Sequence, residues 1–179
     1  MPRKIIIDTD PGQDDAVAIL LALASPEDVT VLGVTAVAGN VPLPLTEKNA
    51  RIVCELAGKP ETKVFAGCAA PIARKLVTAE HVHGTTGLDG PVMEDPQMPL
   101  QDQHAVDFII EALRAEPTGT VTLCPLGPLT NIATAFEKAP DIVEKVQEIV
   151  LMGGGYFEGG NITPTAEFNI YVDPQAADI

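Results

Sequence analysis

Short β-branched runs alternate with amphipathic helical patterns along most of this chain, and that alternation limits the folds open to it. Five runs have the length and composition of buried strands: Lys4–Asp8, Val29–Ala38, Lys63–Ala66, Thr120–Cys124 and Val146–Met152. Strands that alternate with helices form βαβ units, whose strands are parallel. We therefore predict one α/β domain over residues 1–179, with an open, mostly parallel, Rossmann-like sheet flanked by helices.

The predicted helices lie between these runs. Leu45–Ala57 reads as a helix that Gly58 ends. In three other helices, apolar residues recur at i, i+3, i+4 and i+7, the spacing of one helix face: Val17/Leu20/Leu21/Ala24, Val106/Ile109/Ile110/Leu113 and Leu129/Ile132/Ala133/Phe136. Ala70–Gln103 differs, because it is rich in Pro, Gly and polar residues and has no clear periodicity. Ordered loops of such length often cover active sites.

Charge and cysteine content limit the binding partners and the cellular compartment that we expect for this chain. The formal net charge is −14, from 25 acidic and 11 basic residues, so the chain repels phosphate backbones and anionic lipid surfaces. A cation or a neutral, hydroxyl-rich substrate fits better than a nucleic acid or a membrane, although acidity can equally serve solubility. Cys54, Cys68 and Cys124 are widely spaced in apolar surroundings, which predicts reduced core residues. With no signal or membrane-spanning pattern, we expect a cytoplasmic protein.

Four carboxylates crowd the end of the first predicted strand, in Asp8-Thr9-Asp10-Pro11-Gly12-Gln13-Asp14-Asp15. Two carboxylates about 6 Å apart repel by roughly 3 kcal/mol at an effective dielectric near 20. A helix N-terminus recovers only about 0.3–1 kcal/mol per anion. The cluster therefore needs a cation or raised pKa values, and donors that are all oxygen favour Ca²⁺ or Mg²⁺ over zinc. The alternative is that Asp14 or Asp15 merely caps the helix while the others are solvated.

Phosphate chemistry is a weaker interpretation of the same residues. Asp8-Thr9-Asp10 satisfies the Asp-x-Asp pattern of phosphatase-like hydrolases. That chemistry also needs a phosphate-binding Lys and a Ser or Thr, and no clear pair stands at later strand ends. Gly153-Gly154-Gly155 is not followed by Gly-Lys-Ser/Thr, so it is not a nucleotide-phosphate loop.

Six blocks in order resemble the inosine–uridine-preferring nucleoside hydrolase family. They are Asp8–Ala16, Ala38-Gly39-Asn40, Val82-His83-Gly84 with Gly87-Leu88-Asp89-Gly90, Leu126–Asn131, Met152-Gly153-Gly154 and Ala166-Glu167-Phe168-Asn169. The resemblance covers essentially the whole chain. It implies hydrolysis of the N-glycosidic bond of ribonucleosides to ribose and free base, in purine or pyrimidine salvage, with Ca²⁺ and no organic cofactor.

The resemblance also implies roles for individual residues. It implies a calcium site formed by Asp10, Asp15 and the backbone carbonyl of Leu126, with Asp8 as a further candidate ligand, and it makes Asp10 the general base. It implies a substrate site formed by Asp14, Asn40, Met152, Asn161, Glu167 and Asn169, with His83 near the nucleobase as a second catalytic residue. Without the resemblance, His81 and His83 would be read as a surface pair, and the residues from Asn161 onward as loop caps.

The implied chemistry suits these residue types. Breaking an N-glycosidic bond passes through an oxocarbenium-like state, so the site must stabilise positive charge on the sugar and activate a water. A carboxylate beside a calcium-bound water meets the second need, because the ion lowers the pKa of that water. Carboxylate and amide oxygens around a polyol meet the first.

Members of the family usually continue well beyond Ile179. By resemblance, the absent part of the family domain carries another Asp ligand and a His close to the leaving base. Three hypotheses follow: an active hydrolase, a Ca²⁺- or riboside-binding homologue without turnover, and a subunit whose open apolar surface pairs with another chain. The family favours homo-oligomers, dimers or tetramers. Base preference is not predicted.

Overall fold

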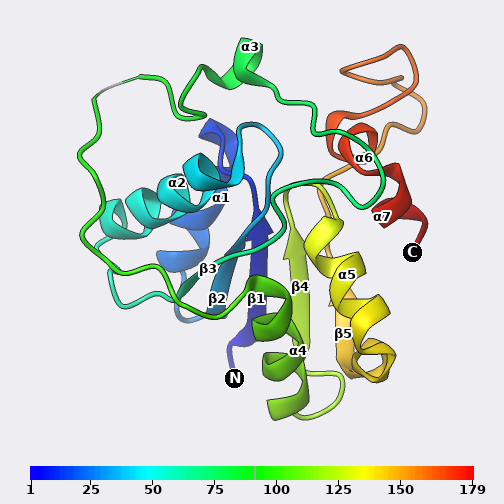
Figure 1. Cartoon of the computed structure of the whole chain (residues 1–179). Coiled ribbons are helices and arrows are strands. Elements are labelled where there is room, and N and C mark those ends of the chain that lie inside the picture. The colour runs from blue at the N-terminus through cyan, green and yellow to red at the C-terminus, as the bar shows by residue number, and fades with distance from the viewer. Residues whose placement is uncertain (91) are drawn as a thin grey trace.

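Five parallel strands form the centre of the protein in a computed structural model that describes residues 1–90 and 92–179 (Figure 1). Their order across the sheet is β3-β2-β1-β4-β5. The strands are β1 (Arg3–Thr9), β2 (Val29–Ala36), β3 (Val64–Ala66), β4 (Val121–Pro125) and β5 (Val146–Ile149). The predicted open parallel sheet is confirmed.

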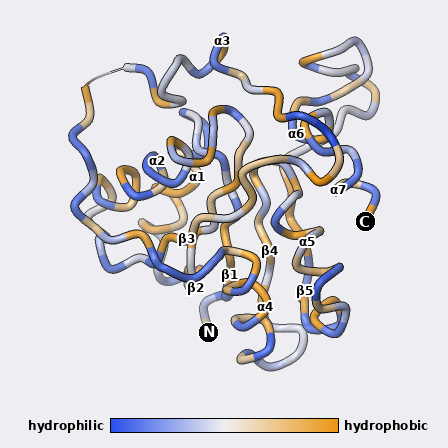
Figure 2. The backbone as a smooth tube through the Cα atoms, in the orientation of Figure 1, coloured by the Kyte–Doolittle hydropathy of each residue, from blue (hydrophilic) through white to orange (hydrophobic). Residues whose placement is uncertain are grey.

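Helices cover both faces of this sheet. They are α1 (Gln13–Leu23), α2 (Leu43–Leu56), α3 (Glu80–His83), α4 (Ala105–Ala115), α5 (Thr130–Lys138), the 3-10 helix η1 (Pro140–Lys145), α6 (Phe168–Val172) and α7 (Pro174–Asp178). Successive side chains of β1 point to opposite faces. Ile5 and Ile7 pack with α1 and α2, and Ile6 packs with α4 and α5. Apolar residues accordingly lie through the middle of the sheet (Figure 2).

The predicted apolar face of α1 is wrong. Val17 and Leu21 are 65% and 68% exposed, whereas Ile19 and Leu23 are buried. Almost every position of α1 after Asp15 is apolar, so spacing alone could not choose a face. Asp15 decides it, because its side chain is buried at the helix start, and Ile19 and Leu23 follow at i+4 and i+8 on the same side.

The other predicted elements agree with the structure except at their ends. Val106, Ile109, Ile110 and Leu113 are all buried beneath α4, as predicted. The last strand ends at Ile149 instead of Met152, although the amides of Val150 and Met152 still donate to Leu123 and Pro125 of β4. Apolar side chains stay exposed along this outer edge: Ile149, Val150, Leu151 and Met152.

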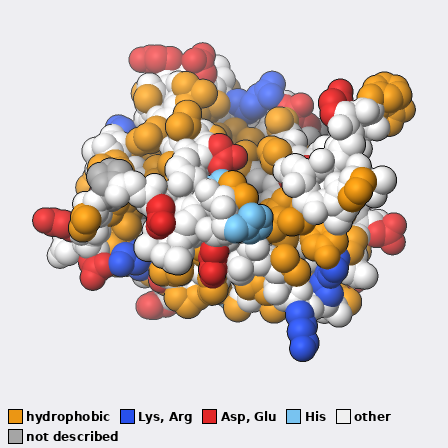
Figure 3. Space-filling model, turned by 90° about the horizontal axis from the view of Figure 1, so that it is seen from above, with side chains coloured by type: hydrophobic (Ala, Val, Ile, Leu, Met, Phe, Trp, Pro, Cys, Tyr) orange, Lys and Arg blue, Asp and Glu red, His pale blue; other side chains and the backbone are white. Residues whose placement is uncertain are grey.

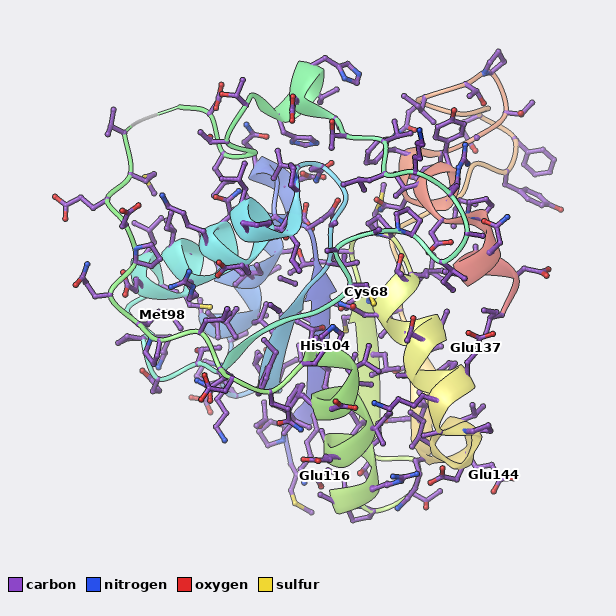
Figure 4. All side chains as sticks on the ribbon, in the orientation of Figure 1. Cys68, Met98, His104, Glu116, Glu137 and Glu144 are labelled. Atoms are coloured by element: carbon purple, nitrogen blue, oxygen red, sulfur yellow. The ribbon has the colours of Figure 1, made fainter. Side chains whose placement is uncertain are left out.

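The predicted aperiodic segment Ala70–Gln103 is mostly irregular. Among its described residues, α3 is the one helix, and Gln101 pairs with Phe65 at the edge of β3. The three cysteines are free, as predicted. In Figure 4, Cys68 lies beside α5 and His104 at the start of α4. No helix in the described ranges combines the length and apolar character that a membrane crossing requires.

The strand order of the sheet reverses between the neighbouring strands β1 and β4. From β1 the chain winds outward through β2 to β3, and it then crosses to β4 and β5 on the other side. In open α/β sheets, ligands bind at the carboxyl ends of the strands at such a switch point. Asp8, Asp10 and Leu126 lie at this place, where β1 and β4 end side by side.

Candidate functional site

Asp8 lies in the interior at the end of β1 and is fully buried. Its Oδ1 accepts hydrogen bonds from Thr35 Oγ1 of β2 (2.5 Å) and Asn131 Nδ2 of α5 (2.8 Å). Its Oδ2 has no hydrogen-bond partner among the described residues. Burial raises the pKa of Asp8 to about 7, and the two hydrogen bonds oppose this rise. The alternative that this carboxylate is simply solvated is therefore wrong.

Asp10 is held between two close-packed turns. Its Oδ2 accepts from the backbone N–H of Asn40 (2.7 Å), while Asn40 Nδ2 donates to the carbonyl of Asp10 (2.9 Å). A Cβ at Gly39 would lie 2.0 Å from Oδ2, and one at Gly127 would lie 2.3 Å from Oδ1. Both glycines are thus required for the backbone to approach the carboxylate this closely. Burial, followed by repulsion from Asp15, raises the pKa of Asp10 well above its ordinary value.

Asp15 both caps α1 and contributes to the acid cluster. Its Oδ1 accepts from Thr9 Oγ1 (2.6 Å) and its Oδ2 from the N–H of Gly12 (3.1 Å). Burial raises its pKa to about 6, although these hydrogen bonds oppose the shift. The capping role considered from the sequence is therefore real, and it coexists with burial beside Asp10. Asp14, one residue earlier, is exposed.

A cavity of about 220 Å³ opens above these acids. Most of the predicted site residues line it: Asp14, Asp15, Asn40, His83, Leu126, Met152, Asn161, Glu167 and Asn169. Asp8 and Asp10 are not among its lining residues, and they are buried at the end of β1. Seen from above, histidine and acidic side chains lie near the middle of this face (Figure 3). The structure thus brings together residues that lie up to 155 positions apart, from Asp14 to Asn169.

The segment that precedes α6 supplies one wall of the cavity. Glu167 caps α6 by accepting from the amides of Asn169 (3.0 Å) and Ile170 (3.2 Å), and it also accepts from Gly154 N–H (3.1 Å). Asn169 Nδ2 donates to the carbonyls of Leu126 (2.7 Å) and Met152 (3.0 Å). Asn161 Oδ1 accepts from the amide of Phe168 (2.7 Å). These polar side chains therefore fasten the wall to the ends of β4 and β5.

Several residues of this site carried no sequence signal of their own. Ala79, His81, Val82, Ile162 and Phe168 also line the cavity. Thr35 and Asn131, which hold Asp8, come from two elements that no local pattern connects. Val82, Asn131 and Phe168 lie inside blocks that resemble the family, and only that resemblance pointed to them. The contact between Gln13 and His83 (2.6 Å) joins segments 70 residues apart.

The candidate ligand atoms at this site are of the type that a hard dication prefers. Asp10, Asp15 and the carbonyl of Leu126 offer only oxygen, and burial raises the pKa values of both carboxylates, a shift that a nearby cation would offset. Among the described residues, however, no group of three or more His, Cys, Asp or Glu side chains is arranged to hold a metal ion. Calcium takes 6–8 oxygen ligands. Asp10, Asp15 and the Leu126 carbonyl would therefore fill only part of such a shell.

The fold and the site define a doubly wound α/β protein with an acidic cleft at its topological switch point. A sequence profile described as inosine-uridine preferring nucleoside hydrolase matches residues 5–179. The chain belongs to this family.

Similar proteins match this chain over nearly its whole length. An uncharacterised Schizosaccharomyces pombe protein is 55% identical over 98% of this chain and 56% of its own length. The inosine-uridine preferring nucleoside hydrolase of Leishmania major is 49% identical over 100% of this chain and 57% of its own. The solved purine-preferring ribonucleoside hydrolase from Gardnerella vaginalis has a TM-score of 0.92 at 37% identity, covering 98% of this chain and 56% of that one. The chain thus spans about half the length of the relatives it matches.

Proposed function

We propose that this chain carries the ribose-binding and part of the calcium-binding machinery of a ribonucleoside hydrolase. The observation that carries this proposal is the convergence of Asp15, Asn40 and Asn169 at one cavity, with the buried Asp10 hydrogen-bonded to Asn40. Family membership supports the reaction class, hydrolysis of an N-glycosidic bond to ribose and free base.

We assign these residues different roles according to their positions. Asp10 is the general base, because it is buried, its pKa is raised and its Oδ2 is oriented by the amide of Asn40. Asp14 and Asn40 line the cavity beside it, and Asn161, Glu167 and Asn169 line the opposite wall, which suits a substrate bearing several hydroxyls. The carboxylates favour the positive charge that the sugar ring develops in the transition state.

Asp10, Asp15 and the Leu126 carbonyl would hold Ca²⁺, with further oxygens from substrate and water. When bound, the ion lowers the pKa of a water molecule and offsets the repulsion between the two carboxylates. Asp8 is a supporting residue in this proposal, because Thr35 and Asn131 already engage its Oδ1.

One assay tests the proposal. The full chain is incubated with inosine or uridine, with calcium and with a chelator, and free ribose is measured. Ribose release that needs calcium and disappears in Asp10→Asn supports it. No release from either nucleoside under any condition overturns turnover by this chain.

A riboside-binding role without turnover is the second candidate, and the incomplete ligand shell favours it. Calorimetry distinguishes the two. Binding of Ca²⁺ and ribose without ribose release supports the binding role, whereas absence of both kinds of binding removes it. Asp15→Asn is the control variant, since it should weaken the binding of Ca²⁺ much more than that of ribose.

A further inference from the structure

The side chain of Gln13 holds His83 at two points. Gln13 Oε1 lies 2.6 Å from His83 Nδ1, and Gln13 Nε2 lies 3.4 Å from the backbone carbonyl of His83. The imidazole also rests on the first turn of α1, where a Cβ at Gly12 would come within 2.5 Å of Nδ1. The ring is therefore placed by the start of α1 as well as by its own short helix α3.

These two contacts determine which ring nitrogen carries the proton. A backbone carbonyl only accepts hydrogen bonds, so the Gln13 atom that faces it has to be the amide nitrogen. The amide oxygen then faces His83 Nδ1, and because that oxygen only accepts, Nδ1 has to be an N–H. A neutral imidazole carries one N–H, which leaves Nε2 with its lone pair. His83 lines the cavity, and no hydrogen bond within the described residues engages Nε2.

We propose that Gln13 is a positioning residue that fixes neutral His83 in its Nδ1–H tautomer, so that Nε2 accepts a hydrogen bond or a proton from a nucleobase. The site then favours bases with a ring N–H on the edge that faces His83, and any proton exchanged with the base is exchanged at Nε2. The choice of a nucleobase as the ligand rests on the proposed function, whereas the tautomer does not.

His104 provides an internal contrast. Its Nδ1 accepts from the amide of Val106 (3.2 Å), so a neutral His104 has to be the Nε2–H tautomer. The chain contains three histidines, His81, His83 and His104. Long-range ¹H–¹⁵N correlation spectra of the full chain, recorded where all three imidazoles are neutral, distinguish a protonated from an unprotonated ring nitrogen. His83→Gln assigns the signal of His83.

We expect opposite tautomers for His83 and His104 in the same spectrum. Gln13→Leu should move His83 toward the Nε2–H form that free histidine favours, whereas Gln13→Glu, which keeps an acceptor beside Nδ1, should retain the Nδ1–H form. Gln147→Leu, at an exposed position of β5, should change nothing. An Nε2–H His83 in the wild-type chain, or one that ignores Gln13→Leu, overturns the assignment.

A second measurement tests the ligand. Wild-type protein should bind inosine roughly 3–10-fold more tightly than 1-methylinosine, since the methyl group removes the ring N–H and with it one hydrogen bond. Gln13→Leu should bring this ratio close to one, and Gln147→Leu should preserve it. Equal affinities in the wild type overturn the nucleobase contact. If neither nucleoside binds, the proposed function fails while the spectra still decide the tautomer.

Discussion

The cavity has two unlike walls. Asp14, Asp15 and Asn40, with the buried Asp8 and Asp10 behind them, form the first wall, and the segment before α6 forms the second. The acid cluster at the end of β1 is built into the sheet, and its side chains are bonded to β2, α5 and the start of α1. The wall before α6 lies outside the sheet and rests on a separate small apolar cluster around Ala79, Phe168 and Val172. The first wall concentrates like charges in the protein interior, and the second presents neutral amides and a capping carboxylate.

The difference separates two tasks that a sugar-cleaving site has to perform. Carboxylates that must stay oriented and poorly hydrated need a rigid, buried setting, and that setting costs stability because it raises their pKa values. Hydroxyl recognition needs a surface that substrate can reach, and loops provide it. Asp173 links the second wall to the rest of the molecule, because its buried carboxylate accepts from Ile72 N–H (3.0 Å), Thr130 Oγ1 (2.6 Å) and Ala176 N–H (3.1 Å).

The largest effect is expected at the first wall. Asp10→Asn should lower the rate of ribose release by about 10²–10⁴-fold, the usual contribution of a general base. The same change should not reduce the stability of the metal-free protein, because it removes the repulsion between Asp10 and Asp15. Initial rates and chemical denaturation measure the two effects. Asp102→Asn, at an exposed position, is the control, and a variant that loses stability with unchanged rate would contradict the comparison.

Asp173→Ala should loosen the second wall alone. It leaves the buried hydroxyl of Thr130 without its acceptor, at a cost of about 1–3 kcal/mol, and it also removes the acceptor of the Ile72 amide. Hydrogen exchange followed by mass spectrometry should accelerate in residues 70–79 and 160–176 and remain slow in β1. Exposed Asp178→Ala should have little effect. Equal acceleration in β1 would show that the two walls unfold as one unit.

The stability of the metal-free protein should fall as the pH rises from 5 to 7.5. Asp8 and Asp15 have folded-state pKa values of about 7 and 6, above the ordinary 3.8, so the folded state binds protons more tightly than the unfolded state over this window. The free energy of unfolding should therefore decrease with pH, by an amount on the order of 4 kcal/mol. Thermal melting at a series of pH values checks this. Millimolar calcium should flatten the slope, Asp8→Asn should reduce it, and a rising stability would refute the pKa assignments.

Glu167→Gln should have the smallest effect. Glutamine keeps an acceptor for the amides that Glu167 caps, so the loss of stability should stay below about 1 kcal/mol, whereas Glu167→Ala should lose about 0.5–2 kcal/mol. Denaturant titrations of both variants measure these losses. A larger loss in Glu167→Gln than in Glu167→Ala would contradict the capping role.

Much of the fold could be predicted because its signals are local. The five strands and the buried face of α4 follow from composition and spacing within a few residues. The face of α1 could not be predicted in this way, because Val17 and Ile19 are equally apolar and a buried carboxylate fixed the rotation of the helix. Among the site residues, the acid cluster could be identified from the sequence, because four carboxylates so close together repel one another. Asn161, Glu167 and Asn169 were identifiable only by family resemblance, because loop polar residues have many ordinary roles.

The sequence by itself determined the alternation of strands and helices, and with it the edge of the sheet at which polar residues gather, since a parallel βαβ chain brings every strand end to one side. Only the tertiary structure decided which side chains share a contact there. It paired Asp8 with Asn131 across 123 positions and Gln13 with His83 across 70. Those contacts depend on how the helices rotate and where the loops fold back, which packing determines over the whole molecule and no local pattern encodes.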